Sequence, residues 1–221
     1  MSEPSSRLFG RRKGRPLHVR KSALVRELLP TLQIDPAATP DPRALFAVPP
    51  VEVWLEIGFG GGEHLAAQAA RHPDIGFVGC EPFLNGVASL LDHIDREQLA
   101  NIRIFPDDAR VLLDAMPDHA LDRCFVLFAD PWPKKRHAER RFIGRANLDR
   151  LARTLKSGAE LRLATDVAPL AAWMREQVAA HPAFVCIGDG PTPPPDWVAT
   201  RYEQKGLAAG RQPVYLGYRR V

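Results

Sequence analysis

The sequence predicts an α/β fold with a seven-stranded, mostly parallel sheet and helices on both faces. Three observations favour this fold. Beyond Val51, apolar runs of strand length alternate with segments of helical pattern, which is typical of a parallel sheet covered by helices. The first runs are short and continuously apolar, as expected where both faces of a strand are buried. Glycines cluster directly after the first run, where a helix is expected to begin.

The expected strands and helices alternate along the chain, and each strand is assigned to an apolar run. Strands are expected over residues 53–57, 75–81, 102–105, 124–129, 160–164, 183–187 and 214–218. Helices are expected over residues 62–71, 84–94, 109–115, 139–155 and 169–180. The proline-rich stretch 191–195 is expected to form an extended loop.

The first part of the chain differs in composition from the rest. Residues 1–26 combine Ser, Gly and Pro with many basic residues, which is typical of a flexible arm that becomes ordered on a partner. A short helix is expected over 23–29, and the stretch 35–42 is expected to be a linker. We therefore divide the chain into a basic arm and linker over 1–42 and a single domain over 43–221.

Basic residues are concentrated in three segments. The formal net charge is +4, yet residues 1–26 carry eight basic groups against one acid, residues 134–153 eight against two, and residues 201–220 five against one. The remainder of the chain is therefore acidic. Lys and Arg side chains bind a phosphate backbone by releasing its counterions, so the three segments favour a nucleic-acid partner. A solvated basic face is the alternative for any one segment.

Several other classes of protein are disfavoured. No apolar run reaches the roughly 18 residues that a membrane span needs, and the first residues lack the basic-then-apolar order of a secretory signal. We therefore expect a cytoplasmic protein with no membrane partner. Cys80, Cys124 and Cys186 are widely separated and show no Cys-x-x-Cys spacing, so neither disulfides nor a metal site is expected. The sequence is compatible with a monomer or a homodimer.

The stretch 55–63, Leu-Glu-Ile-Gly-Phe-Gly-Gly-Gly-Glu, reads as a strand that ends in glycines and leads into a helix. Glycines such as Gly58 and Gly60 allow positive φ and let the backbone approach a nucleotide-like ligand. A dinucleotide-binding turn has glycine where Glu63 stands, and this carboxylate disfavours a pyrophosphate. S-adenosylmethionine has positive charges and no phosphate, so acids near the turn, Glu56 included, suit it better. A purely structural tight turn is the alternative.

Acids also follow the next two expected strands. Glu81 lies 25 residues after Glu56, near the spacing at which an acid meets ribose hydroxyls in nucleotide-binding α/β folds. After the third strand, Asp107 and Asp108 could offer a carboxylate to an adenine amino group. Either acid could instead cap the helix that follows, an interpretation that we favour for Asp107.

The fourth expected strand leads directly into Asp130, which is followed by Pro-Trp-Pro-Lys-Lys-Arg-His over residues 131–137. Prolines fix φ and Trp132 offers a ring face for stacking. The loop is similar to the acid-or-Asn, proline, aromatic loop of amine methyltransferases, which implies that it holds a planar nitrogen nucleophile. Guanine N7 has an exposed lone pair and no proton to remove, so Asp130 could assist by alignment and charge without acting as a general base. Phosphates are expected to contact the basic residues that follow: Lys134, Lys135, Arg136, Arg140 and Arg141. A proline-stiffened surface turn is the alternative.

Two later segments complete the pattern. Residues 164–166, Ala-Thr-Asp, end the fifth expected strand, at the functional edge of such a sheet. Residues 200–203, Thr-Arg-Tyr-Glu, open the last basic segment. Both could instead be helix caps or turns. His137, among basic neighbours, is expected to lie near phosphate rather than to bind a metal.

Together these motifs resemble those of the bacterial tRNA (guanine-N7)-methyltransferases over almost the whole chain. The matching motifs are Gly14-Arg15, Leu-Glu-Ile-Gly-Phe-Gly at 55–60, Glu81, Asp108, Asp-Pro-Trp-Pro-Lys-Lys-Arg-His at 130–137, Ala-Thr-Asp at 164–166 and Thr-Arg-Tyr-Glu at 200–203. The resemblance implies a Rossmann-like, S-adenosylmethionine-dependent methyltransferase fold. It also implies an enzyme that methylates N7 of a guanine in the variable loop of tRNA.

The resemblance assigns roles to individual residues. Beside the turn glycines Gly58 and Gly60, it implies a cofactor site lined by Glu56, Glu81, Asp108 and Asp130, with Asp130 also catalytic. It implies a substrate site that includes Lys134, Asp166, Thr200, Arg201, Tyr202 and Glu203. The departures from the family pattern are Ala129 in place of Pro, Arg201 and Tyr202 in place of Lys and Phe, and the additional Gly61.

Three other functions stay open on the sequence alone. The first is a non-catalytic RNA-binding protein that retains the fold, which the intact acids argue against. The second is a nucleotide-dependent oxidoreductase, which Glu63 disfavours. The third is a methyltransferase that acts on a small molecule or a protein, which the basic segments disfavour.

Overall fold

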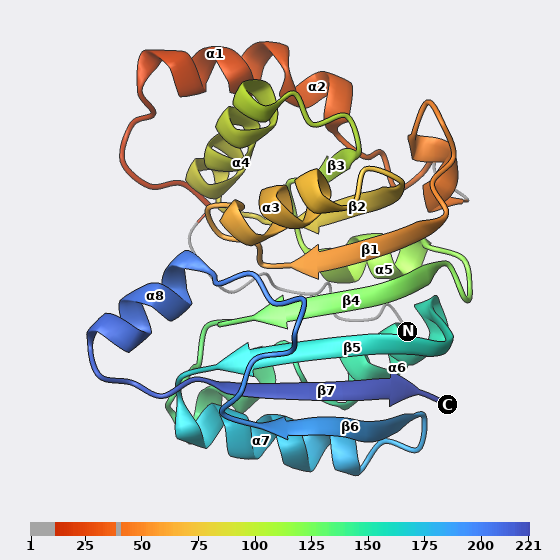
Figure 1. Cartoon of the computed structure of the whole chain (residues 1–221), viewed down its shortest axis with the longest axis vertical. Helices are drawn as coiled ribbons and strands as arrows, with labels where there is room; N and C mark the ends of the chain where they lie inside the picture. The colour runs from red at the N-terminus through yellow and green to blue at the C-terminus, as the bar shows by residue number, and fades with distance from the viewer. Residues whose placement is uncertain (1–11, 39–40) are drawn as a thin grey trace.

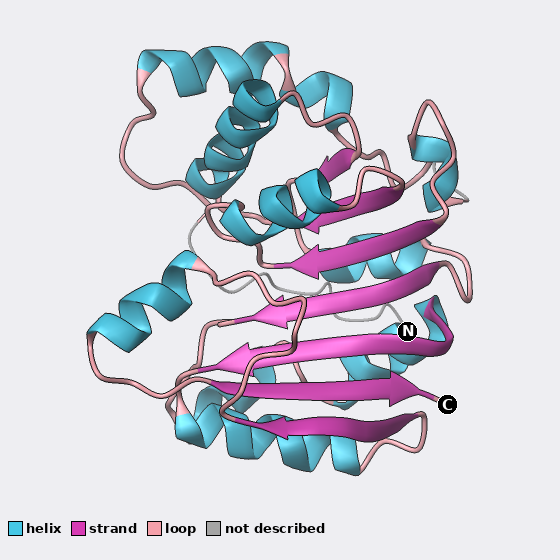
Figure 2. Cartoon of the chain, in the orientation of Figure 1, coloured by secondary structure: helices cyan, strands magenta, loops and turns pink. Residues whose placement is uncertain are grey.

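The structure is a computed structural model that describes residues 12–38 and 41–221 (Figure 1). Residues 1–11, which belong to the expected arm, and residues 39–40 of the expected linker lie outside the described residues. In the described part, helices lie on both sides of a central sheet (Figure 2).

One sheet of seven strands runs through the described residues in the order β3-β2-β1-β4-β5-β7-β6. The strands are β1 (Glu52–Ile57), β2 (Ile75–Cys80), β3 (Ile102–Phe105), β4 (Leu121–Leu127), β5 (Leu155–Thr165), β6 (Phe184–Gly190) and β7 (Val214–Arg220). Neighbouring strands from β3 to β5 are parallel, whereas β7 is antiparallel to both β5 and β6. The expected seven-stranded, mostly parallel sheet is therefore confirmed.

Helices cover both faces of this sheet, as the sequence predicts. They are α1 (Val19–Glu27), α2 (Leu29–Leu32), α3 (Glu63–Arg71), α4 (Leu84–Glu97), α5 (Ala109–Ala115), α6 (Arg145–Thr154), α7 (Ala168–Ala179) and α8 (Arg201–Ala208), with short 3-10 segments at Pro42–Leu45 and Lys135–Arg140. Helices α2, α3 and α4 pack with Trp54 on one face, and α5, α6 and α7 pack with Leu55 on the other. Successive residues of a strand point to opposite faces, which separates these two neighbours. Among the described helices, none has the length and apolar character needed to cross a membrane.

The beginning of the described chain is more ordered than the sequence predicts. In place of one helix over 23–29 there are two, α1 and α2. Arg20 donates to Asp92 and Asp95 of α4, each at 2.7 Å, and Leu29 and Leu32 are buried. These apolar and ionic contacts attach part of the expected arm and linker to the sheet domain.

The single helix expected over 139–155 is wrong. A 3-10 segment ends at Arg140, the backbone is extended at Arg141 and Gly144, and α6 begins only at Arg145. The Arg141 side chain bonds the loop after β4, and this tertiary contact outweighs the local helical pattern. The strand that follows, β5, starts at Leu155 and is correspondingly longer than expected.

Candidate active site

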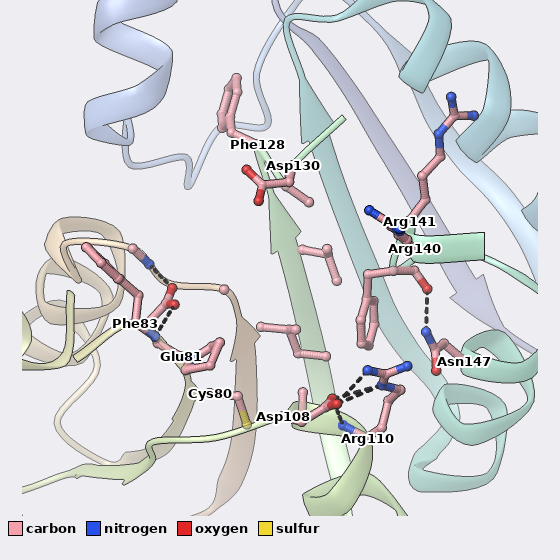
Figure 3. A pocket seen from close by; sticks show the side chains of 18 of the residues that line it. Cys80, Glu81, Phe83, Asp108, Arg110, Phe128, Asp130, Arg140, Arg141 and Asn147 are labelled. Carbon is pink, nitrogen blue, oxygen red and sulfur yellow. Dashed lines mark hydrogen bonds and ion pairs between the residues drawn. The ribbon is translucent and has the colours of Figure 1, made fainter. Parts of the chain in front are cut away.

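A cavity of about 640 Å³ opens at the carboxyl ends of β1, β2 and β4, the edge where ligands bind in parallel α/β sheets (Figure 3). Six of the residues that the sequence predicts for the site line it: Gly58, Gly60, Glu81, Asp108, Asp130 and Tyr202. The other six are not among the described residues that line it: Glu56, Lys134, Asp166, Thr200, Arg201 and Glu203. The cavity therefore unites segments that are far apart in the sequence.

The turn after β1 depends on its glycines. Gly58, Gly60 and Gly62 have φ values of 73°, 57° and 80°, which other residues rarely adopt. The backbone N–H of Gly60 donates to Oε2 of Glu81 at 2.9 Å. The turn is thus fixed to the end of the neighbouring strand, and the backbone of Gly58 lies uncovered in the cavity wall.

Glu81 directly follows β2 and is almost fully buried. Its Oε1 accepts from the N–H of Phe83 and its Oε2 from that of Gly60, both at 2.9 Å. Burial raises the pKa of the Glu81 carboxyl; the two N–H donors oppose this shift, and the negative charges of Asp130 and Glu56 add to it. Each carboxylate oxygen can accept a further hydrogen bond, so Glu81 can bind ligand hydroxyls.

Asp108, and not Asp107, caps helix α5. Its Oδ1 accepts from the backbone N–H of Arg110 at 3.0 Å, and the Arg110 guanidinium donates to both carboxylate oxygens. Asp107 instead accepts from the N–H of Asp108 at 2.8 Å and from Arg12 at 2.9 Å. Asp108 is therefore held in a fixed orientation in the cavity wall.

Asp130 lies on a loop whose backbone is strained. Phe128 and Trp132, on either side of it, have φ values of 50° and 41°. Positive φ at residues other than glycine costs about 1–3 kcal/mol each and is concentrated at functional sites. Figure 3 shows the Asp130 carboxylate pointing into the cavity, and it makes no hydrogen bond or ion pair with another described residue. This carboxylate is available to a ligand.

The basic residues after this loop differ in what they contact. Lys134 and Arg136 are exposed, as expected of phosphate ligands, while the Lys135 side chain lies outside the described part of the structure. The Arg140 guanidinium lies 5.2 Å from the Trp132 ring centroid. Arg141 turns back to the loop and donates to two of its carbonyl groups.

Glu56 faces away from the cavity. It belongs to the opposite face of β1, and its Oε2 lies 2.6 Å from Nδ1 of His64 in α3. Both side chains are buried, and the His64 ring contacts the rings of Phe125 and Trp197. The structure thus gives Glu56 a partner inside the protein, where the sequence predicts a cofactor contact.

The stretch from Thr200 to Glu203 forms the first turn of α8, so the helix-cap alternative is correct for two of its residues. The Thr200 side chain accepts from the N–H of Glu203, and the Glu203 carboxylate accepts in return from the N–H of Thr200. Glu203 also accepts from the Trp197 indole and from the hydroxyl of Tyr215. This capping leaves Arg201 and Tyr202 exposed.

Tyr202 reaches the cavity mouth because the capped turn presents it there. A Cβ atom on Gly60 would lie 3.0 Å from its ring, so Tyr202 lies over the glycine turn. Asp166, the residue directly after β5, contacts the same region: its carboxylate accepts from Arg211 at 2.6 Å and faces Gly206 of α8. Asp166 therefore supports α8 rather than lining the cavity.

Sequence reasoning missed several lining residues, among them Phe83, Phe142 and Asn147. Phe83 stands two residues after Glu81, and this aromatic beside the strand-end acid is a signal that could have found it. Phe142 and Asn147 had no such signal, because they were assigned to the interior of a continuous helix. Their place in the cavity follows from the break before α6, where Asn147 donates to the carbonyl oxygen of Phe142 at 2.7 Å.

We expect Gly86→Ala to weaken ligand binding at the turn. A Cβ atom at Gly86 would overlap the carbonyl oxygen of Gly60, so the turn must shift. Overpacking of this kind costs about 1–3 kcal/mol. Calorimetric titration with S-adenosylmethionine measures the effect, and Gly144→Ala, which meets open space, is the matched control. Equal affinity in both variants would contradict the close contact between Gly86 and the carbonyl oxygen of Gly60.

The sheet order and the acid-lined cavity define the class of protein as a Rossmann-like α/β protein with a ligand site at the carboxyl ends of its parallel strands. Solved structures that share this fold include two rRNA methyltransferases. One is the 16S rRNA methyltransferase KamB, with TM-score 0.59 and 14% identity, covering 81% of this chain and 91% of that one. The other is a mutant 16S rRNA (adenine(1408)-N(1))-methyltransferase with cosubstrate SAM from Catenulisporales acidiphilia, with TM-score 0.58 and 17% identity, covering 85% and 92%. At these identities the likeness shows the Rossmann-like methyltransferase fold alone.

Sequence comparison identifies the family. The family described as "Putative methyltransferase" matches residues 51–216. The tRNA (guanine-N(7)-)-methyltransferase of Rhodospirillum rubrum is 50% identical over 224 residues, covering 97% of this chain and 88% of the relative. The protein of the same name from Paramagnetospirillum magneticum is 52% identical over 221 residues, covering 97% and 92%. The chain belongs to the tRNA (guanine-N(7)-)-methyltransferase family, as its motifs predict.

Proposed function

We propose that this protein transfers a methyl group from S-adenosylmethionine to N7 of a guanine in the variable loop of tRNA. The observation that carries the proposal is the Asp130 carboxylate, which bonds no other described residue and projects into an acid-lined cavity beside a glycine turn. The names of its relatives support the same reaction and the same substrate. The proposal also places the protein in the cytoplasm, with tRNA as its partner.

The residues of the cavity fit S-adenosylmethionine. Glu81 has acceptor positions for ribose hydroxyls, and the uncovered backbone at Gly58 permits close approach of a ligand. Phe83 offers a ring face for a purine, and Asp108 a carboxylate for an amino group. The negative charges of Glu81 and Asp130 suit a ligand that carries a sulfonium and an ammonium and has no phosphate. When bound, this cofactor supplies an electrophilic methyl group to the attacking lone pair of N7.

The chain's own groups contribute orientation and charge. Guanine N7 has no proton to lose, so the site needs no general base. Asp130 can orient the base and stabilise the positive charge that develops on the purine. The rings of Trp132 and Tyr202 line the same cavity and can flank a planar base.

The tRNA backbone is proposed to bind the exposed cations around the cavity mouth. Arg201 directly precedes the lining residue Tyr202, and Lys134 and Arg136 follow the lining residue Trp132 by two and four positions. Cations in such positions bind phosphates without reading sequence. They bring the target nucleotide to the cavity, while the carboxylate faces the base.

The proposal is tested with purified protein, labelled S-adenosylmethionine and unmodified tRNA, followed by nucleoside analysis of the product. Labelled 7-methylguanosine is the expected result. A tRNA with adenine in place of the target guanine is the control and should stay unlabelled. Cofactor binding without any labelled nucleoside would favour a non-catalytic RNA-binding protein instead.

A further inference from the structure

The loop after β4 has few backbone donors of its own. Asp130 is followed by Pro131 and Pro133, and proline has no N–H group. The loop also passes through positive φ at Phe128 and Trp132. A loop with few donors and an unfavourable backbone conformation keeps one position only if surrounding groups hold it.

Arg141 supplies two such contacts. Its Nε donates to the carbonyl oxygen of Pro131 at 3.1 Å, and its Nη2 donates to that of Trp132 at 3.2 Å. One guanidinium therefore binds two successive carbonyl groups directly after Asp130. The planar fork of arginine presents both donors in a fixed geometry, which the single ammonium of lysine cannot reproduce.

Trp173 of α7 holds Arg141 in turn. The guanidinium carbon lies 4.9 Å from the centroid of the Trp173 ring, within the range of a cation–π contact. The indole Nε1 of Trp173 also donates to the carbonyl oxygen of Ile143 at 2.6 Å, and Ile143 is buried. One side chain of α7 thus fixes the segment that carries Arg141.

We propose that Arg141 is a positioning residue that fixes the Asp130 loop, with Trp173 as its support, and not a ligand of tRNA phosphates. The inference rests on the proposed function, in which Asp130 orients the guanine. Because the Asp130 carboxylate bonds no other described residue, its place in the cavity depends on the loop backbone and so on Arg141. The exposed cations Lys134 and Arg136 stay available for phosphates.

The test compares Arg141→Ala with Lys134→Ala. We expect Arg141→Ala to lower kcat at saturating tRNA on the order of 10- to 100-fold, since a misplacement of about 1 Å at a reacting centre costs that much. Its tRNA affinity should keep the wild-type salt dependence. Lys134→Ala should instead reduce the slope of log affinity against log salt by about one, as loss of a phosphate contact does. Guanidinium ion, matched against sodium chloride, should restore part of the kcat of Arg141→Ala.

A second variant and a second measurement guard against simple misfolding. Trp173→Phe keeps a ring beneath Arg141 and loses the donor to Ile143, so it should lower kcat less than Arg141→Ala, again with an unchanged salt slope. Hydrogen exchange of the peptide over residues 128–134 reports the order of the loop without any turnover. It should be faster in both variants.

A phosphate role for Arg141 gives the opposite pattern. The salt slope of Arg141→Ala would then fall by about one, while kcat and loop exchange stayed at wild-type values, and the inference would be overturned. Wild-type protein that is inactive on tRNA would count against the proposed function instead. In that case the exchange measurement still decides whether Arg141 holds the loop.

Discussion

Replacing Asp130 with alanine is expected to lower methyl transfer to tRNA on the order of 100- to 1,000-fold. The carboxylate projects into the cavity at the end of β4. In the proposed function, it faces the guanine on which positive charge develops as N7 is methylated. Removing a preorganised opposite charge from such a site typically costs this much in rate. The measurement is kcat with saturating S-adenosylmethionine and unmodified tRNA.

Asp130→Asn is the matched control, because it keeps the shape of the side chain and removes its charge. A loss as large as that of Asp130→Ala would assign the effect to charge, and a smaller one would assign part of it to hydrogen bonding. Calorimetry on both variants shows whether the carboxylate also binds the amine of the cofactor. Wild-type kcat in Asp130→Ala would contradict the role of this loop.

The second large effect is expected for stability. Glu56 and His64 form a buried pair at 2.6 Å, away from the cavity. His64→Ala opens a cavity and leaves the buried carboxyl group of Glu56 without its hydrogen-bond partner, which together should lower the free energy of unfolding by about 3–5 kcal/mol. Urea unfolding followed by circular dichroism measures the loss.

Removing both partners tests the same pair and its relation to the cofactor. The double variant Glu56→Met/His64→Leu leaves no unpaired carboxyl group and fills the space of both side chains, so it should be clearly more stable than His64→Ala. It should also bind S-adenosylmethionine with near wild-type affinity, because Glu56 does not line the cavity. A large loss of affinity in a folded double variant would instead support the cofactor contact that the family resemblance implies for Glu56.

Much of the fold and part of the site could be predicted because strand ends meet in space. Glu81 and Asp130 each follow an apolar run, and parallel strands bring such ends to one edge of the sheet. The resemblance of the motifs to those of a known family predicted the cofactor and the reaction. Neither the strand-end argument nor the family resemblance required knowledge of how individual side chains pack.

The remainder of the site depended on contacts that a local pattern does not contain. Side chains alternate along a strand, so Glu56 and the cavity-lining Ile57 face opposite sides of β1, and only the position of His64 shows what Glu56 meets. The prediction of one helix over residues 139–155 was wrong for a similar reason. Its pattern gave no sign that Arg141 bonds the loop across the site.

The antiparallel placement of β7 also constrains the order in which the chain can fold during synthesis. Among the described strands β6 pairs only with β7, which is made later, and α8 lies between them in sequence. Ribosomes add about 5–20 residues per second and folding proceeds from the first part made. The half of the sheet from β1 to β4 can therefore assemble on the ribosome first. Strand β6 and the segment with Tyr202 can take their final positions only after β7 has been synthesised. A pause in translation before residue 214 would prolong the time during which β6 has no strand to pair with.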